Sequence, residues 1–583
     1  MARSYPDRVA RSPQRGEDQG PPQRGSGQGG GGGHNPKRDR LAEVGRGSTL
    51  NLAGAAISAV AGVITTVLVT RHFSRPVAGA FFTATSAFVI VRSMASVGAN
   101  TGVTYFVARL RSLGEERRLP SIMRAAIIPV AVASVVAAAA MWVFAVPLAN
   151  LLLSGRQAHG EVTPAQVSDA LRALAVVVPA SALLTVFIGA TRGYHDMRPT
   201  NVISQLGLAV GQIAGILVAV FLGSAALLAP LWAAPFVPLA IIAWLWLRRI
   251  QRKPRARGGL LAAVPPEIAA LMALATPSLS SNGGARTKKR TGSRVSNRRL
   301  ANANPRGFWA FSIPRGIANT AQNILARIDI VLVASIMGVA AAAVYTAATR
   351  FLAVGQLGGV AINNAAQPRF TELFTAGDRR GANDIYQATT AWLVLLLWPL
   401  FLLAIVYGPQ VLLVFGRSYS AGTTVIVVLG FAALFSTACG QVDMVLITSG
   451  RSSWSLANGL LAVVVNVAVD LVLIPKYGIL GAAIGWAVAM LLTNLMPLIQ
   501  LGVVYRLHPL GRGTIIACLW TGLSFGIVPL VAREVLGSTP LALLAGLAAG
   551  CVLQVIGLWW FRGALRLSAM PGMSSIMRRL SRH

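Results

Sequence analysis

Charge is scarce in this sequence, and negative charge is the scarcest. Only 12% of the 583 residues are charged, and 18 Asp and Glu stand against 52 Lys and Arg. Soluble domains are nearer one-quarter charged, so this composition excludes an ordinary water-soluble fold. The chain has three cysteines (Cys439, Cys518 and Cys551), none with metal-ligand spacing. They indicate neither a disulfide framework nor a metal site.

Hydrophobic residues take the place of the missing charge. They make up 54% of the chain, and the mean hydropathy is +0.62. Apolar runs of about 20 residues recur along most of the length, and each can cross a bilayer core of roughly 30 Å. The runs lack the alternation of outer-membrane barrel strands. We therefore expect an all-α polytopic membrane protein with about 14 transmembrane helices.

The net charge of +34 is a topology signal. Most Lys and Arg fall in alternate loops and in both tails, as the positive-inside rule requires. This distribution predicts cytoplasmic N- and C-termini and no nucleic-acid partner. The loops expected on the outer side contain only Arg71, Arg75, Arg156, Arg417, Lys476 and Arg533.

The low-complexity stretches define the expected domains. Residues 1–47 are Gly-rich with almost no apolar cluster, which predicts a disordered cytoplasmic tail followed by an uncleaved signal anchor. Residues 248–306 are predicted to be a basic cytoplasmic linker, which either touches anionic membrane lipid or is an incidental insertion. The remaining units are an N-terminal six-helix bundle (48–247), a second six-helix bundle (307–505), helices 13–14 (506–562) and a basic cytoplasmic tail (563–583).

The two predicted bundles share short sequence matches in the same order. Residues 65–88 resemble 329–351, and residues 192–201 resemble 449–458, with Gly and Asn eight apart in both. Each half starts on the inner side, so the matches predict a parallel pseudo-repeat of six plus six helices, with two extra helices at the C-terminus.

Three stretches resemble a known family. They are "FWAFSIPRGIANTAQNILARIDIVLVASIMG" (308–338), "AAAVYTAATRF" (341–351) and "LIPKYGILGAAIGWAVA" (473–489). Together with the helix count, they resemble the multidrug/oligosaccharidyl-lipid/polysaccharide exporter (MOP) superfamily, and within it the polysaccharide-type, Wzx-like flippases. The lipid-II branch usually has an Arg-Asp pair in its first helix, whereas "LNLAGAAISAVAGVITTVLVT" here carries no charge.

The resemblance implies a flippase in a bacterial plasma membrane. It would move a polyprenyl-diphosphate-linked oligosaccharide from the inner to the outer leaflet by alternating access, for cell-surface polysaccharide synthesis. A polysaccharide polymerase and glycosyltransferases would be its partners. No cofactor is implied beyond coupling to a Na⁺ or H⁺ gradient. A lipid-II-type flippase of peptidoglycan synthesis and a cation-coupled small-molecule (multidrug) exporter are the alternatives.

Arginines inside the predicted spans are the first candidate site residues. Arg92, Arg327 and Arg350 lie near mid-membrane in helices 2, 7 and 8. An ionised side chain facing lipid there costs at least about 2.5–3.5 kcal/mol, so such residues face a polar cavity or a partner. The planar guanidinium donates two hydrogen bonds at once, which suits a diphosphate. Pairing with a neighbouring carboxylate or carbonyl is the alternative for each.

Acidic residues in the spans are candidates for a salt bridge or a coupling cation. Asp329 lies two residues after Arg327, so on one helix the two would point about 200° apart. A salt bridge from Asp329 to an arginine of another helix is favoured. Asp443 has Gln441 nearby and forms a further polar cluster. Asp470, with Asn466 four residues earlier, forms another polar cluster; because Asp470 lies near the outer end of its span, solvation is the alternative for it.

Amide side chains in helices 7 and 8 are candidates for binding sugar hydroxyls. They are Asn319, Gln322, Asn323, Asn363 and Asn364. Hydrogen bonding between helices is an equally good explanation. The sequence has no Walker loop, no Gly-x-Ser-x-Gly and no Asp-x-Asp, so an enzyme is not expected. A non-transporting scaffold or a polyprenyl-dependent glycosyltransferase is therefore the weakest interpretation.

Overall fold

The computed structural model describes residues 54, 56–154, 162–252, 305–537 and 539–565. All regular elements within these ranges are helices, which confirms the all-α class. The two predicted tails, 1–47 and 563–583, and the linker 248–306 lie wholly or mostly outside the described residues. Their roles therefore stay predictions.

The first half of the chain begins with the short apolar helix Ala56–His72. It continues with α2 (Arg75–Ser96), α3 (Ala99–Ser112), η1 (Glu116–Arg118), α4 (Leu119–Val143), α5 (Ala145–Leu152), α6 (Pro164–Gly193), η2 (Thr200–Gly207), α7 (Leu208–Phe221), η3 (Ala225–Leu227), α8 (Leu228–Ala233) and α9 (Phe236–Arg252). A capping box of Thr163 and Gln166 starts α6, where it satisfies amide groups that the first helical turn leaves without partners.

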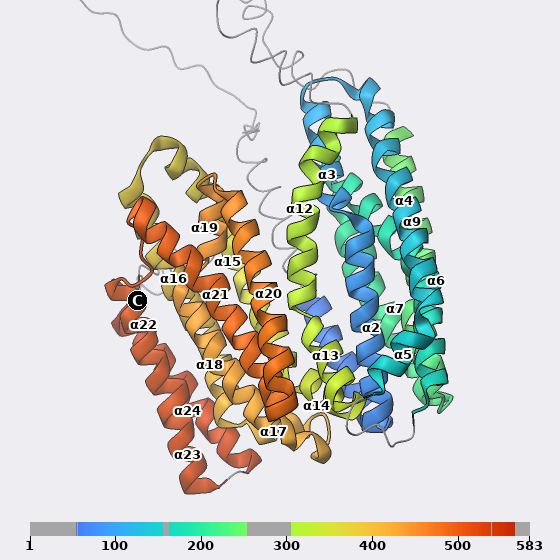
Figure 1. Ribbon diagram of the computed structural model, residues 1–583. Coiled ribbons are helices and arrows are strands. Elements are labelled where there is room, and N and C mark those ends of the chain that lie inside the picture. The colour runs from blue at the N-terminus through green and yellow to red at the C-terminus, as the bar shows by residue number, and fades with distance from the viewer. Residues whose placement is uncertain (1–53, 55, 155–161, 253–304, 538, 566–583) are drawn as a thin grey trace, which may run out of the picture. The chain divides into compact units, whose positions relative to one another are not determined.

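The second half contains the remaining helices. They are α12 (Pro305–Leu325), α13 (Ile328–Met337), α14 (Val339–Ala348), α15 (Arg350–Ala376), α16 (Arg379–Val406), α17 (Gly408–Leu413), η4 (Arg417–Gly422), α18 (Thr423–Cys439), α19 (Val442–Thr448), α20 (Ser452–Tyr477), α21 (Ile479–Tyr505), α22 (Arg512–Gly522), η5 (Leu523–Ile527), α23 (Val528–Leu536) and α24 (Pro540–Trp560). In Figure 1, α12, α13 and α14 lie beside α2 and α3, and each of the three contacts α2.

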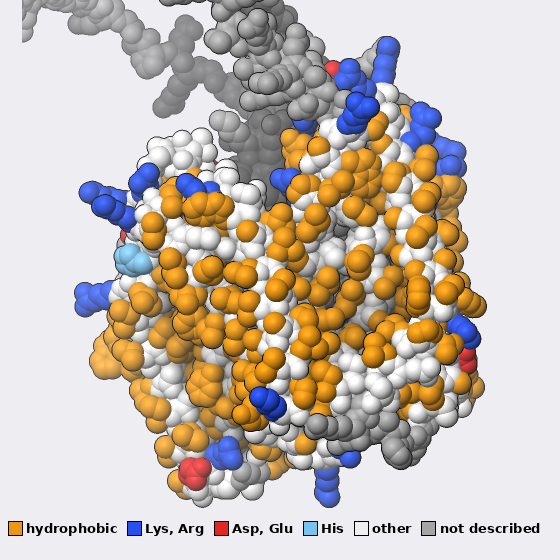
Figure 2. Space-filling view, viewed as in Figure 1, with side chains coloured by type: hydrophobic (Ala, Val, Ile, Leu, Met, Phe, Trp, Pro, Cys, Tyr) orange, Lys and Arg blue, Asp and Glu red, His pale blue; other side chains and the backbone are white. Residues whose placement is uncertain are grey.

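The described residues contain eleven helices that are long and apolar enough to cross a membrane. The count is twelve if the bent pair α12 and α13 forms one span. Helix Ala56–His72 corresponds to predicted span one, and the pair α14–α15 corresponds to predicted span eight. These helices are shorter or more polar than the eleven, so they are not in the count. A polytopic membrane protein is therefore confirmed. Figure 2 agrees, because hydrophobic side chains cover the middle of the visible face and Lys and Arg gather toward its two ends.

Predicted span seven is broken at the point where its charges lie. Helix α12 ends at Leu325, α13 begins at Ile328, and the two axes differ by 42°. Arg327 is the N-cap residue of α13, with φ −135°, and Asp329 lies in the first turn of α13. This corrects the continuous helix expected from the sequence. A carboxylate in the first turn is favoured by the helix dipole, which accounts in part for an acidic residue at this position.

Helices α2 and α14 approach each other so closely that a glycine is required. A Cβ atom added at Gly79 would collide with the carbonyl oxygen of Val339. Val339 and Ala343 line this contact from α14 and are buried. Small residues allow helix backbones to approach in this way in membranes. The contact positions α14, and with it the start of α15, against the first half of the chain.

Candidate functional site

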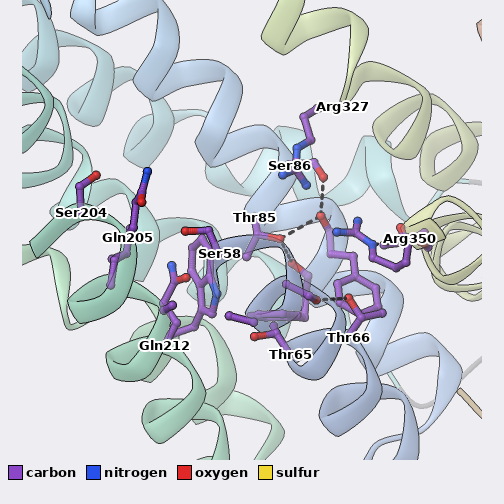
Figure 3. A pocket seen from close by; sticks show the side chains of 18 residues that line it. Ser58, Thr65, Thr66, Thr85, Ser86, Ser204, Gln205, Gln212, Arg327 and Arg350 are labelled. Atoms are coloured by element: carbon purple, nitrogen blue, oxygen red, sulfur yellow. Dashed lines mark hydrogen bonds between the residues drawn. The ribbon is translucent and has the colours of Figure 1, made fainter. Parts of the chain in front are cut away.

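A cavity of about 200 Å³ lies where the first half of the chain meets α13, α14 and α15. Its walls come from helix Ala56–His72, α2, η2, α7 and α8 on one side, and from the starts of α13 and α15 with the end of α14 on the other. The lining residues are Ser58, Ala61, Gly62, Thr65, Thr66, Phe81, Phe82, Thr85, Ser86, Ser204, Gln205, Leu208, Ala209, Gln212, Trp232, Arg327, Thr346 and Arg350. Figure 3 shows the polar members of this set.

Two of the three predicted arginines line this cavity. Arg327 and Arg350 are half-buried and lie on its wall. Arg350 is the first residue of α15, and its Nε donates to the carbonyl oxygen of Thr346 at 3.2 Å. This bond leaves the terminal nitrogens of Arg350 available for a ligand. We call Arg327 and Arg350 the arginine wall.

Arg92 lies close to the arginine wall but is not part of the cavity lining. Its guanidinium lies over the ring of Phe236, 5.7 Å from the ring centroid. Arg327 is near enough to interact electrostatically with both Arg92 and Arg350. The three arginines predicted to converge are thus neighbours, with Arg327 acting on the other two. Three positive charges of this kind repel one another, so an anion between them would be stabilised.

The opposite wall of the cavity carries neutral polar groups. Ser204 and Gln205 come from η2, a π-helical segment that follows Pro199, and Gln212 comes from α7. Figure 3 shows these side chains across the cavity from Arg327 and Arg350. We call Ser204, Gln205 and Gln212 the amide wall.

The hydroxyl groups between the two walls are mostly committed to their own helices. Thr66, Thr85 and Ser86 each donate to a backbone carbonyl four residues earlier, at 2.7–2.9 Å. Their oxygens can still accept hydrogen bonds. The described residues of the cavity lining include no Asp or Glu, so the formal charges among them are the two positive charges of the arginine wall.

A second polar cluster lies beyond Arg327, on α13, α14 and α20. Tyr345 Oη donates to Asp329 Oδ2 at 2.7 Å. Asp470 and Asn466, both fully buried on α20, lie next to Asp329. A Cβ atom added at Gly485 of α21 would collide with Asp470 Oδ1, so this glycine makes room for the carboxyl group. We call Asp329, Tyr345, Asn466 and Asp470 the carboxyl cluster.

The carboxyl cluster corrects two interpretations of the sequence. Within the described ranges, Asp329 makes no salt bridge to an arginine, which was the favoured reading. Asp470 is 0% exposed rather than solvated. Within the part of the chain that the structure describes, several buried oxygens of the cluster have no hydrogen-bond partner: Asp329 Oδ1, both carboxylate oxygens of Asp470 and Asn466 Oδ1. Buried groups of this kind are costly unless a ligand or a proton satisfies them.

The predicted amides of α12 lie away from the cavity lining. Asn319, Gln322 and Asn323 are exposed. Asn323 Nδ2 donates to Ser93 Oγ at 3.1 Å and to the carbonyl oxygen of Asn319 at 2.9 Å. Asn323 therefore links α12 to α2, which matches the alternative of hydrogen bonding between helices.

The remaining predicted residues lie in the second half of the chain. Asn363 is half-buried on α15, and its Oδ1 has no hydrogen-bond partner. The side chain of Asn364 lies outside the description. Asp443 is half-buried in the first turn of α19 and lies beside Ser455. The structure places neither Asn363 nor Asp443 in the cavity or in the carboxyl cluster.

Sequence reasoning did not select the neutral polar residues of the cavity, although a signal was present. Ser204, Leu208 and Gln212 are spaced four apart, as are Ser58, Gly62 and Thr66. This spacing keeps each set on one helix face. A small or polar stripe at helical spacing within an apolar span marks a face turned toward protein or cavity rather than lipid.

The fold and a match to a family model together define a membrane transporter of the MOP superfamily. The MatE family profile matches residues 53–218 and 314–472, which is more than half of the chain. The chain belongs to the MatE family. The two matched segments fall one in each predicted bundle. Comparison with curated proteins gives no match.

Solved structures share the fold at low sequence identity. A structure described as lipid II flippase MurJ in an inward closed conformation superposes with a TM-score of 0.63 at 12% identity, covering 88% of this chain and 98% of that one. An inward-facing MATE-family multidrug resistance transporter gives 0.57 at 12%, covering 79% and 99%. A MOP superfamily transporter from Pyrococcus furiosus, reported with reversed polarity of its binding pocket, gives 0.50 at 14%, covering 79% and 96%.

Proposed function

We propose that this transporter is a flippase for a polyprenyl-diphosphate-linked oligosaccharide, which it moves from the inner to the outer leaflet. One observation carries the proposal: among the described residues that line the cavity, the charged ones are Arg327 and Arg350, with Arg92 beside them. A diphosphate carries the opposite charge and presents paired oxygens that match the guanidinium fork. The neutral polar groups opposite the arginines suit the sugar rather than the phosphates.

The chemistry of the cavity also weighs against export of a cationic drug. A cationic substrate would need a carboxylate or an aromatic surface free of competing cations, because opposite charge gives the main attraction. The described part of the lining offers two arginines and no acidic residue. A lipid-II-type substrate remains the second candidate, because it shares the polyprenyl diphosphate with the first and the arginine wall would bind either.

We further propose that the carboxyl cluster couples transport to a monovalent cation. Its unpartnered oxygens come from α13 and α20, and oxygen ligands of this kind suit Na⁺. Alternatively, one proton shared by Asp329 and Asp470 would relieve the repulsion of two adjacent carboxylates. Either ligand would draw α13 and α20 together.

The cluster and the cavity are joined through neighbouring residues. Arg327 lines the cavity, and Asp329 two residues later belongs to the cluster. Thr346 lines the cavity, and Tyr345 beside it bonds to Asp329. A shift of α13 or α14 on cation binding therefore moves the arginine wall as well. This supplies a physical link between an ion gradient and the binding of an anionic substrate.

A reconstituted flipping assay tests the proposed function. Proteoliposomes with the purified chain should move a fluorescent polyprenyl diphosphate–saccharide between leaflets at a rate well above protein-free vesicles. A cationic dye in the same vesicles should not accumulate. Dye transport without movement of the lipid-linked saccharide would instead establish a small-molecule exporter. Lipid II as a third probe would separate the two flippase candidates.

A further inference from the structure

The amide wall has features that the binding of a diphosphate does not use. Ser204 and Gln205 come from the eight-residue π-helix η2, Thr200–Gly207. A π-helical segment within a transmembrane helix is rare, is less favourable than the α-helix, and is found mostly at functional sites. This one changes the direction of the side chains just before Gln212 on α7. The backbone irregularity therefore coincides with the wall that carries neutral polar groups.

The amide wall also has hydrogen-bonding capacity to spare. Within the described residues, the side chains of Ser204 and Gln212 are half-buried and make no hydrogen bond. The side chain of Gln205 packs against the backbone of Gly54. The approach is so close that a Cβ atom added at Gly54 would collide with Gln205 Oε1. An amide side chain presents two donors and an acceptor with two lone pairs. Gln212 and Ser204 therefore offer both donors and acceptors toward the cavity, without any charge.

The size of the cavity and its apolar surface further restrict the kind of ligand that it can bind. A cavity of about 200 Å³ is smaller than the usual ligand pocket of about 300–1,000 Å³, so only the part of the substrate nearest the diphosphate can lie in it. Trp232 lines the cavity and lies edge-on to Phe81 and Phe88, with ring centroids 6.0 Å away in each case. Aromatic surface beside a few fixed polar groups is the usual composition of a specific small-molecule pocket.

We propose that the amide wall is a subsite for the first sugar of the substrate, the one attached directly to the diphosphate, and that Gln212 and Ser204 select an uncharged sugar. The inference rests on the proposed function, because the diphosphate must lie at the arginine wall for its sugar to reach Gln212. A hydroxyl or N-acetyl group satisfies the amide of Gln212. A free amino sugar would bring an ammonium group to a cavity whose described lining already holds two arginines and no carboxylate.

The test uses three lipid probes: polyprenyl diphosphate without sugar, the same lipid bearing N-acetylglucosamine, and the same lipid bearing glucosamine with its free amine. Apparent Kd values are measured for the full chain in nanodiscs. We expect the N-acetylglucosamine lipid to bind most tightly. The glucosamine lipid should bind no better than the sugar-free lipid, since its ammonium group has no acidic partner.

Variants then separate the two walls. Gln212→Ala should raise the Kd for the N-acetylglucosamine lipid about three- to tenfold, as the loss of one neutral hydrogen bond does, and leave the sugar-free lipid unchanged. Ser204→Ala should act in the same direction. Gln554→Ala removes an amide from α24, far along the chain from the cavity lining, and should change neither value. Gln212→Asn, which keeps the amide, guards against loss through misfolding.

The outcomes distinguish this inference from the function on which it rests. If Gln212→Ala and Ser204→Ala leave all three affinities unchanged while Arg350→Ala weakens all three, the sugar subsite is wrong and diphosphate binding stands. Tight binding of the glucosamine lipid would also overturn the subsite. If none of the three lipids binds, or if Arg350→Ala has no effect on any of them, the proposed function itself fails.

Discussion

Replacing Arg350 with alanine should reduce flipping of a polyprenyl diphosphate–saccharide by at least about 100-fold while leaving the protein folded. Removal of one partner from a buried, hydrogen-bonded charge pair costs about 2–5 kcal/mol, and about 2.8 kcal/mol corresponds to 100-fold. Arg350 lies on the cavity wall, and within the described residues its hydrogen bond is the one that its Nε donates to the carbonyl oxygen of Thr346. Its terminal nitrogens are therefore expected to bind substrate rather than to stabilise the fold.

Arg350→Lys separates charge from geometry. An ammonium group keeps the positive charge but loses the planar fork, so we expect partial activity between that of alanine and that of the native residue. Arg369→Ala is the matched control. It removes an arginine from the same helix, α15, at an exposed position paired with Glu372 at 2.8 Å. Exposed pairs of this kind contribute little to stability, so activity should be retained.

The measurements are the flipping rate in proteoliposomes and the melting temperature in detergent. A structural role for Arg350 would lower the melting temperature and the folded yield of the alanine variant. Native flipping in Arg350→Ala, with Arg327→Ala equally active, would remove the main support for an anionic substrate.

Replacing both Asp329 and Asp470 with asparagine should abolish the dependence of transport on a cation gradient. The two carboxyl groups face each other in the carboxyl cluster and leave several oxygens without partners. Asparagine keeps the shape and one oxygen per side chain but removes the negative charge that a cation needs. Tyr345 can still donate to the remaining oxygen of residue 329, so folding should be preserved.

The expected result is a flipping rate that no longer responds when the Na⁺ or H⁺ gradient is imposed or collapsed. Downhill movement of the lipid probe should persist, because the arginine wall is intact. Asp169→Asn is the control: its side chain is 73% exposed and pairs with Arg172 at 3.6 Å, three residues later on α6. Full gradient dependence in the double variant would show that the carboxyl cluster is structural.

Much of the architecture could be predicted because a bilayer imposes simple constraints. Backbone groups inside lipid must be satisfied within each helix, so long apolar runs become helices. The same constraint made the arginines informative: Arg327 and Arg350 were selected for their depth alone, and both line the cavity. Arg92 lies outside the cavity lining, against Phe236. Its depth in the membrane could be predicted from the sequence, but its contacts depend on side-chain packing.

The partner of Asp329 could not be predicted from local spacing. Helix geometry over a few residues relates Arg327 to Asp329, but Asp470 lies on α20, more than a hundred residues further along the chain. Which helices touch is decided by packing, here by α13 lying against α20 and by the space left at Gly485. The break between α12 and α13 has a related cause. Arg327 and Asp329 face different sites, as their spacing on one helix predicts, but the 42° bend between α12 and α13 was not predicted.

The π-helix was missed for a further reason. Residues 200–207 have no composition that distinguishes a π-helical turn from an α-helical one, and only the four-residue spacing of Ser204, Leu208 and Gln212 was visible. The alanine-rich and valine-rich spans align easily with one another. Short matches between such spans are thus weak support for the predicted repeat, and the match of the MatE profile to two separate segments supports it better.

A structure of the protein with a bound polyprenyl diphosphate–saccharide in a lipid nanodisc tests the central claim most directly. The account predicts the diphosphate between Arg327 and Arg350, with phosphate oxygens about 2.7–2.9 Å from guanidinium nitrogens. The first sugar should lie toward Ser204 and Gln212. A diphosphate bound outside this cavity, with Arg327 and Arg350 making no contact to the substrate, would contradict the account.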